Sequence, residues 1–296
     1  MKTIHKPIYI LALMITALIS CKTELNYDFE LEQPKLVVNG KLIADSAIEI
    51  RVTRSMNLLE LQFDKYLTNA VVKLYENNTL LGIATHRKAG YYYLENKVKA
   101  NTNYRIEVSC AGFESVWAET FVPNYLQEIL VDTIPVVTDY GYTALQLELT
   151  IHDELTETNY YDFFVTDRPK MYYDFEARDS IIVHPKIYLE SNDNSIITNI
   201  NESEVLITDK LFNGGTKRIR FWAFLPSNDY AYFNLAHISE SLYKFLTDLE
   251  AYDKAKENPL AEQNTVFSNI NGGYGIFGGA AIKTDSIYFK EQPFKK

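Results

Sequence analysis

Short stretches in which apolar and polar residues alternate dominate the sequence from residue 35 to residue 121. In residues 48–53, Ile48, Ile50 and Val52 fall on one face and charged residues on the other, which predicts a half-buried antiparallel strand. Turn residues separate such stretches at intervals of about 8 to 12 residues, as is typical of a β-sandwich. Strands are predicted at 35–39, 48–54, 70–75, 81–85, 91–94, 104–109 and 115–121.

A second β-rich region follows Pro123 and Asn124, which mark a predicted domain boundary. Residues 143–151 alternate cleanly, whereas residues 160–165 are apolar on both faces and predict a strand that is covered on each side. Further strands are expected at 129–134, 181–189, 205–208 and 218–225, and at 266–270 and 286–289 around a glycine-rich turn.

One helix is predicted at residues 240–255, where Leu242, Phe245 and Leu246 recur at helical spacing and Ser239 can serve as N-cap. We expect it to lie across a sheet or its open end. The fold class is therefore mainly β. Residues 34–123 resemble an Ig-like or transthyretin-like β-sandwich, and residues 124–296 are expected to form a second β-sandwich domain with one packed helix.

The N-terminus has the order of a secretory signal. Lys2 and Lys6 precede an apolar run at 8–19 that is shorter than the roughly 20 residues needed to cross a bilayer. Residues 18–21, Leu-Ile-Ser-Cys, resemble the bacterial lipobox, which implies cleavage after residue 20 and lipid attached to Cys21. Residues 21–33 are polar and acidic, so we expect a solvated tether between the lipid anchor and the first domain.

Charge and cysteine content narrow the class of protein. Without residues 1–20 the chain carries 27 Lys and Arg residues against 39 Asp and Glu residues, a formal charge of −12. This balance argues against nucleic acid as a partner, because phosphate binding needs a basic face. If Cys21 carries lipid, only Cys110 remains, so no intramolecular disulfide is expected.

Residues 273–278 match the pattern G-x-G-x-x-G by letter. A dinucleotide site needs a helix that begins at these glycines, yet residues 280–288 predict loop and strand. We therefore interpret the glycines as permitting a tight turn or close sheet packing, and we expect no cofactor.

The densest group of candidate acid, base or metal-binding side chains is His152, Asp153 and Glu154, with Glu157 nearby. A metal site needs convergent ligands and usually a second histidine at a defined spacing, and the sequence shows none. His86, His184 and His237 share no motif with this group. We favour a solvated acidic loop there and a simple turn at residues 192–194, and we predict neither a metal site nor catalytic residues.

Aromatic residues are abundant, with 22 tyrosines and 16 phenylalanines. The clusters at 91–93, 160–161 and 171–173 could stack on sugars or on a protein partner. Strands also favour aromatic residues for packing alone, so the sequence leaves both interpretations open.

The C-terminal region contains Asn-Pro-Leu-Ala-Glu at 258–262 and Phe-Ser-Asn-Ile-Asn-Gly-Gly-Tyr-Gly-Ile-Phe-Gly-Gly at 267–279. With the segments at 34–40, 69–72 and 242–246, these motifs resemble the Bacteroidota family of domain of unknown function 4249. The resemblance implies an outer-membrane lipoprotein that is usually encoded near a TonB-dependent transporter. The acidic residues just after Cys21 also resemble the signal that exports Bacteroidota lipoproteins to the outer face of the outer membrane, so we expect the protein to face the cell exterior.

Three hypotheses about function follow. The first is a non-catalytic surface lipoprotein that docks on an outer-membrane β-barrel protein, a TonB-dependent transporter, and captures or retains its cargo. The second is a glycan- or peptide-binding module or adhesin that acts alone. The third is a hydrolase that uses the region of His152.

Overall fold

The computed structural model describes residues 33–57, 65–137, 143–153, 158–174, 179–193, 197–223, 229–256 and 265–290. The predicted signal peptide, Cys21 and the tether up to residue 32 lie outside the described residues, as do Glu154, Glu157 and the motif at 258–262. Residues Pro34–Lys296 form one compact unit. Among the described residues, no helix has the length and apolar character needed to cross a membrane.

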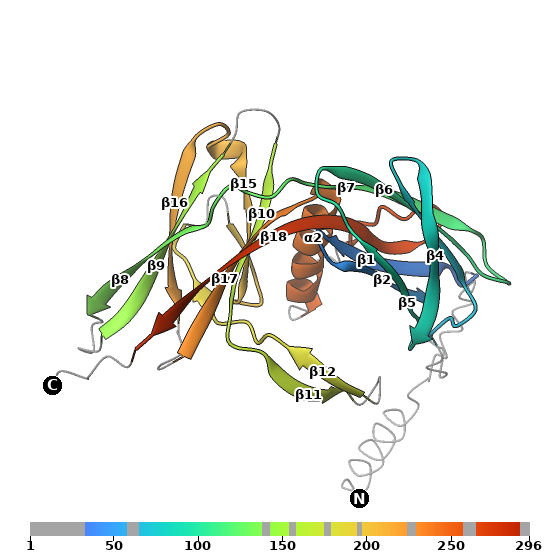
Figure 1. Cartoon of the computed structure of the whole chain (residues 1–296), viewed down its shortest axis with the longest axis horizontal. Coiled ribbons are helices and arrows are strands. Elements are labelled where there is room, and N and C mark those ends of the chain that lie inside the picture. The colour runs from blue at the N-terminus through green and yellow to red at the C-terminus, as the bar shows by residue number, and fades with distance from the viewer. Residues whose placement is uncertain are drawn as a thin grey trace, which may run out of the picture. The chain divides into compact units, whose positions relative to one another are not determined.

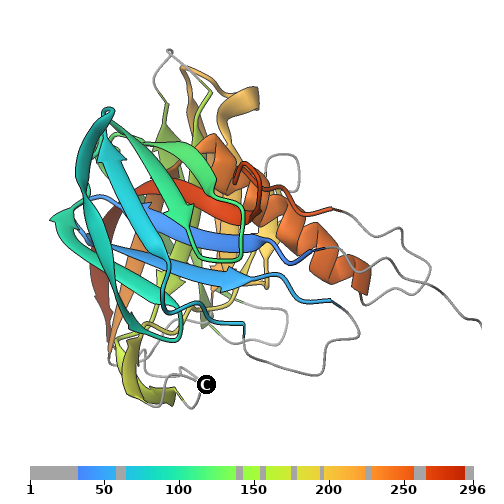
Figure 2. The same cartoon turned by 90° about the vertical axis from the view of Figure 1, so that its right-hand side faces the viewer.

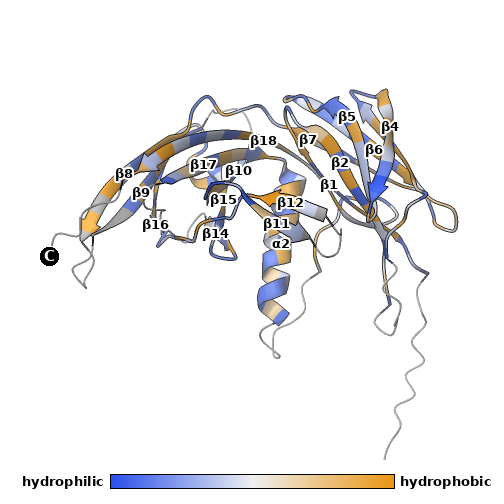
Figure 3. Cartoon of the chain, turned by 60° about the horizontal axis from the view of Figure 1, so that its bottom comes forward, coloured by the Kyte–Doolittle hydropathy of each residue, from blue (hydrophilic) through white to orange (hydrophobic). Residues whose placement is uncertain are grey.

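The N-terminal half of this unit is a β-sandwich, as predicted (Figure 1). Its strands continue in the order β1-β2-β5-β4-β3-β6-β7, and buried side chains from all of them meet in one core. Buried and exposed side chains alternate along β7, because one face of the strand is buried. Orange and blue segments are interspersed along the strands of this sandwich (Figure 3). The strands are β1 (Leu36–Ile43), β2 (Ala47–Arg54), β3 (Val71–Glu76), β4 (Thr79–Lys88), β5 (Tyr91–Lys97), β6 (Thr102–Ser109) and β7 (Val116–Val122).

The second half is also a sandwich. A sheet in the order β13-β16-β9-β8 packs on the end of the long sheet that runs β14-β15-β10-β17-β18, and Phe163 and Phe221 meet between them with ring centroids 5.3 Å apart. The elements are β8 (Leu130–Val137), β9 (Thr143–His152), β10 (Tyr160–Thr166), β11 (Lys170–Asp174), β12 (Asp179–Val183), β13 (Leu189–Glu190), β14 (Ile197–Ile200), β15 (Glu204–Thr208), η1 (Asp209–Leu211), β16 (Thr216–Ala223), β17 (Asp229–Ile238), α2 (Glu240–Lys256) and β18 (Tyr274–Phe289).

Helix α2 covers the other face of the long sheet (Figure 2). Leu242 is buried there against Ala236, Ile238 and Ala280, and the Ser239 Oγ caps the helix by accepting a hydrogen bond from the Leu242 N–H at 3.3 Å. Strand β10 is thus covered by a sheet on one side and by the helix on the other. The predictions of the helix, of its N-cap and of a doubly covered strand at 160–165 are confirmed.

Strand β18 pairs with strands from both halves. Its first part runs parallel to β1, with Val37 opposite Tyr274, and its second part runs antiparallel to β17, with Asp229 opposite Phe289. The predicted boundary after Pro123 stays a prediction. The pairing adds that the C-terminal strand completes the sheet of the N-terminal sandwich.

Gly272 and Gly273 lie in a turn that precedes β18, and Gly275, Gly278 and Gly279 lie within that strand, so the glycines do not separate strands at 266–270 and 286–289 as predicted. Gly275 has φ +107°, and a Cβ there would lie 2.1 Å from the Val38 carbonyl oxygen. A Cβ on Gly279 would lie 2.5 Å from the Phe121 carbonyl oxygen. The interpretation that the glycines permit a tight turn or close packing of the sheet is confirmed, with the turn at Gly272 and the close packing at Gly275 and Gly279.

Several other elements differ from the predictions. Residues 266–270 are irregular rather than a strand, because side chains bond to the backbone there in place of a neighbouring strand: Asn269 bonds to both backbone groups of Phe277. The predicted strand at 181–189 is divided into β12 and β13, since Pro185 has no N–H to continue the first one. The alternation pattern did not predict β11, β14 or β17.

Candidate functional site

The largest hollow that we describe is a cleft of about 810 Å³ where the segment after β7 crosses the second sandwich. Its floor is formed by buried side chains of Ile151, Tyr161 and Leu235, and its rim carries His152 and His237. This volume lies within the range of about 300–1,000 Å³ that is typical of small-molecule sites. The remaining lining residues are Asn101, Phe121, Asn124, Tyr125, Leu126, Gln127, Glu128, Thr150, Asp153 and Asn159.

Asp153 is buried at the base of the cleft. Its Oδ1 accepts hydrogen bonds from the Tyr161 hydroxyl and from the Asn159 Nδ2 at 3.1 Å, and its Oδ2 accepts one from the Gly214 N–H at 2.8 Å. The prediction of a solvated acidic loop is therefore wrong for Asp153. Three donors, two from residues 159–161 and one from Gly214, replace water around this carboxylate.

A second carboxylate, Asp209, lies close to Asp153. Its Oδ2 accepts a hydrogen bond from the Asn159 N–H at 2.7 Å. Burial raises the pKa of Asp209, and the nearby charge of Asp153 raises that pKa further. Asn159 therefore joins two buried acidic groups, and together with Tyr161 they fix the shape of the cleft floor.

The two histidines of the rim come from distant parts of the sequence. The His152 Nδ1 lies 2.7 Å from the Thr216 Oγ1, and the His237 Nδ1 lies 3.1 Å from the Asn124 carbonyl oxygen. The sequence shows no relation between them, because β9 and β17 belong to different sheets whose packing brings the two histidines to one cleft and leaves no local motif. His86 is elsewhere, edge-on to Tyr92 in the first sandwich.

Within the described ranges, no group of three or more His, Cys, Asp or Glu side chains could hold a metal ion. In the predicted turn at 192–194, the Asp193 carboxylate pairs with Lys217 at 2.7 Å, and Asn194 lies outside the described residues. A smaller hollow of about 400 Å³ adjoins the cleft and shares His152 with it, and Glu148 on its wall pairs with Arg220 at 2.7 Å.

The three tyrosine clusters have different environments. Tyr92 is buried, and its hydroxyl donates to the Leu67 carbonyl oxygen at 2.9 Å and accepts from the Ala70 N–H at 2.8 Å. Tyr161 is buried as described above. Only the cluster at 171–173 is strongly exposed, on the hairpin of β11 and β12 that lies apart from the larger sheets (Figure 1). In each of the first two clusters one tyrosine belongs to the core and the others are partly exposed.

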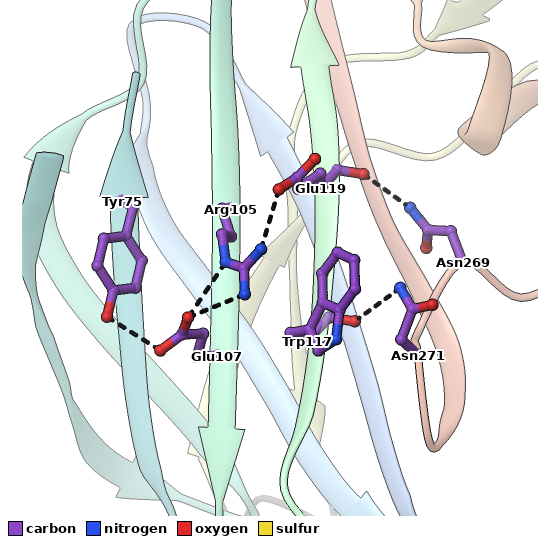
Figure 4. A network of polar contacts seen from close by, with 7 residues as sticks. All are labelled: Tyr75, Arg105, Glu107, Trp117, Glu119, Asn269 and Asn271. Carbon is purple, nitrogen blue, oxygen red and sulfur yellow. Dashed lines mark hydrogen bonds and ion pairs between the residues drawn. The ribbon is translucent and has the colours of Figure 1, made fainter. Parts of the chain in front are cut away.

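An exposed aromatic and charged group lies on β6 and β7 (Figure 4). The Arg105 guanidinium lies 4.4 Å from the centroid of the Trp117 ring and donates hydrogen bonds to Glu107 and Glu119, each at 3.1 Å. The Tyr75 hydroxyl donates to Glu107 at 3.0 Å. These contacts hold Trp117 and its neighbours in one arrangement at the surface. The alternation pattern predicted the strands but gave no signal for this group.

The asparagines of the C-terminal motif are structural (Figure 4). The Asn269 Nδ2 donates to the Glu119 carbonyl oxygen at 3.1 Å, and the Asn271 N–H donates to the Trp117 carbonyl oxygen at 2.8 Å. They fasten β7 to the segment that leads into β18.

Cys110 is a buried, free thiol that donates to the Asn69 Oδ1 at 3.3 Å, and burial raises the pKa of this thiol.

Comparison with known proteins gives one family. A family profile described as "Domain of unknown function (DUF4249)" matches residues 22–286. No curated protein matches the sequence. The match to the family covers both halves of the described unit.

Two solved structures have a distant likeness. A DUF3823 family protein from Bacteroides uniformis is 14% identical with a TM-score of 0.19, and the match covers 86% of this chain and 99% of that chain. A β-glucuronidase from Parabacteroides merdae is 10% identical with a TM-score of 0.21, and the match covers 70% of this chain and 24% of that chain. The chain thus spans about a quarter of the β-glucuronidase.

Proposed function

Because the chain belongs to the family described as Domain of unknown function (DUF4249), we propose that it is a non-catalytic surface lipoprotein of the outer membrane. Lipid on Cys21 anchors it, facing the cell exterior, and it docks on an outer-membrane β-barrel protein, a TonB-dependent transporter, whose cargo it captures or retains. The observation that carries the docking step is the exposed apolar surface of the β11–β12 hairpin.

This hairpin exposes large apolar side chains to solvent. Met171 is 74% exposed and stands opposite Ile182, which is 68% exposed, so the two share one face of the hairpin. The half-exposed Tyr173 follows on the same face. An isolated two-stranded hairpin is marginally stable in water, and contiguous exposed apolar side chains mark interaction sites. A protein partner that covers Met171 and Ile182 would stabilise the hairpin and would remove these apolar side chains from water.

The cleft supplies a space for cargo. Its lining combines apolar Phe121 and Leu235 with polar Asn124, His152 and His237, a mixture that is typical of ligand sites. Since the cleft and the hairpin are formed by different parts of the chain, docking and capture can be tested separately.

The docking step is tested in the producing cell. Lipidated protein is extracted in mild detergent, purified by an affinity tag and examined for a co-purified barrel protein. We expect a barrel to be recovered with the wild type and lost with Met171→Glu combined with Ile182→Glu. Leu80→Glu on β4, a side chain that is 51% exposed, is the matched control and should retain the barrel. Failure to recover any barrel, or equal recovery with all variants, contradicts docking.

The anchor and the absence of catalysis are tested separately. Cys21→Ala should release the protein from membranes, and unchanged attachment would contradict the anchor.

For the hydrolase hypothesis, the purified protein and His152→Ala are screened on esters, glycans and peptides. Activity that is present in the wild type and lost in His152→Ala would replace our proposal with that hypothesis.

A second candidate function is a binding module that acts alone, which the exposed aromatic group on β6 and β7 favours. The two functions differ in what binding requires. A module that acts alone holds its ligand without any barrel, and its mutation leaves uptake by the cell unchanged. An accessory of a transporter loses uptake when the hairpin is changed, even though the isolated protein still binds.

A further inference from the structure

We propose that the cleft and the neighbouring surface of β6 and β7 form one continuous site for a neutral oligosaccharide. The inference rests on the proposed role in cargo capture and names the chemical class of the cargo. The β6–β7 face consists of Asn103, Arg105 and Glu107 on β6 and Trp117, Glu119 and Phe121 on β7. Opposite partners in the register are Glu107 and Trp117, Arg105 and Glu119, and Asn103 and Phe121.

Phe121 joins this face to the cleft, because it belongs to both. Asn101 and Tyr125 continue the surface along the cleft wall. The rings of Trp117, Phe121 and Tyr125 recur every four residues and have nearly equal exposure, at 39%, 40% and 39%. Trp117 and Phe121 are about 13 Å apart by the rise of a strand, so one sugar ring cannot contact both. The ligand that fits is an oligomer.

Two of the three rings, those of Trp117 and Tyr125, are held in place before any ligand binds. Arg105 lies over Trp117 and is itself fixed by Glu107 and Glu119. The Tyr125 hydroxyl donates to the Asp45 Oδ2 at 2.7 Å, and burial together with this bond raises the pKa of Tyr125 to about 12. A preorganised surface binds with a smaller loss of side-chain entropy.

The charges of the face favour a neutral ligand. Two carboxylates match the single guanidinium of Arg105, and the cleft adds Glu128 and Asp153. Anionic ligands therefore meet a surface that repels them. A neutral sugar instead offers hydroxyl groups, which can donate to Glu107 and Glu119 and accept from Asn103, and C–H faces that pack on aromatic rings.

A peptide that adds to the sheet as another strand does not fit this face. The backbone of Trp117 already pairs with Asn271, and the carbonyl oxygen of Glu119 accepts from Asn269. On its other side β7 is fully paired with β6. With this edge occupied, strand addition is blocked, and recognition must come from side chains on the flat face.

The test uses the lipidated protein in mild detergent and measures binding by calorimetry. The probes are cello-, xylo-, manno- and malto-oligosaccharides of one to six sugars, a sulfated heparin fragment and a tryptic digest of casein. We expect one of the neutral series to bind, with affinity that rises with length, and no binding of heparin or peptides. Absence of binding across the neutral series, or preference for heparin or peptides, overturns the proposal.

Variants then locate the site. Trp117→Ala and Phe121→Ala should each weaken binding about tenfold or more, whereas Trp117→Phe should keep most of it. Tyr172→Ala on the hairpin is the matched exposed aromatic control and should bind as the wild type does. Unfolding midpoints show that each variant is folded. Equal affinity of Trp117→Ala, Phe121→Ala and wild type overturns the site. Loss of the barrel with retained sugar binding would instead contradict the docking proposal alone.

Discussion

The glycines of the C-terminal motif are required by the space around them. Gly275 combines φ +107° with a Cβ position 2.1 Å from the Val38 carbonyl oxygen. Gly275→Ala should lower the free energy of unfolding by about 3 kcal/mol or more, because backbone strain and overpacking add. Gly112→Ala is the control: its φ is +85° but no atom lies within 4 Å of its Cβ, so only strain of about 1–2 kcal/mol is expected. Urea unfolding measures both, and equal losses would contradict the clash.

The buried carboxylate of Asp153 should contribute strongly to the stability of the fold. Asp153→Ala leaves the Tyr161 hydroxyl, the Asn159 amide and the Gly214 N–H without their acceptor, so we expect a loss of about 2–4 kcal/mol in the free energy of unfolding. Asp253→Ala removes an exposed pair with Lys256 and should cost about 1 kcal/mol or less. Similar losses in these two variants, measured by urea unfolding, would show that Asp153 is solvated after all.

Local signals made some residues predictable and left others hidden. Ser239 was predicted as an N-cap and Ile48, Ile50 and Val52 as a buried face, because capping and alternation depend on neighbours in the sequence. His237 and Phe121 gave no such signal. Their place in the cleft depends on which strands pair, and no local pattern contains that information.

At the scale of elements, β10 carries a buried charge between two layers. Asp162 is fully buried, and the Lys41 Nζ lies 3.7 Å from its Oδ2. The negative charge of Glu204 on β15 also raises the pKa of Asp162, and Glu204 is itself paired with Lys186. Burial raises the pKa of Asp162 to about 7, although Lys41 and Lys186 lower it. Lys41 on β1 and Asp162 on β10 thus form an ion pair between the two halves.

The raised pKa makes stability depend on pH. An unfolded aspartate has a pKa near 4, so the folded state binds the proton more tightly between about pH 4 and pH 7. The stabilisation from this proton is complete below pH 4 and is lost as the pH rises through 7. Asp162→Asn removes this dependence, so its stability relative to wild type should increase from pH 5 to pH 8. Urea unfolding at the two pH values measures this, and parallel changes in both proteins would contradict it.

Elements with a clear period were predictable, and those with mixed patterns were not. The seven strands of the first sandwich and α2 follow alternation or helical spacing, and each was predicted. Strand β17 buries Phe233 and Leu235 on one face and Ala236 and Ile238 on the other, so it lacks alternation. The glycines of 272–279 have turn composition, yet several of them lie within a strand. They are needed there because neighbouring strands of the same chain approach closely.

In the whole molecule, β18 links the two halves and so bears on whether they unfold separately or together. Its 16 residues pair first with β1 and then with β17, so one strand belongs to the sheets of both halves. Asn269, Asn271 and Gly279 add contacts to β7. Unfolding of either half would leave part of β18 without its partner and expose its buried face. We therefore expect the halves to unfold together.

The two tryptophans can test this, because each half contains one. Trp117 lies on β7 and Trp222 on β16, so Trp222→Phe leaves a probe of the first sandwich and Trp117→Phe leaves a probe of the second. In urea, the fluorescence of each variant should follow the same transition as its circular dichroism, and that transition should be single. Coincident transitions from different probes are the mark of one cooperative unit.

Independent unfolding of the two halves would give a different result. If β18 pairs too weakly to couple the halves, Trp117 and Trp222 report different midpoints, and circular dichroism in each variant shows two steps. That result would support the predicted division after Pro123 and two independently stable domains. Gly279→Ala, which crowds β18 against β7, should then lower the midpoint reported by Trp117 more than that reported by Trp222. With cooperative unfolding it lowers both equally, since any loss in one half is shared by the whole.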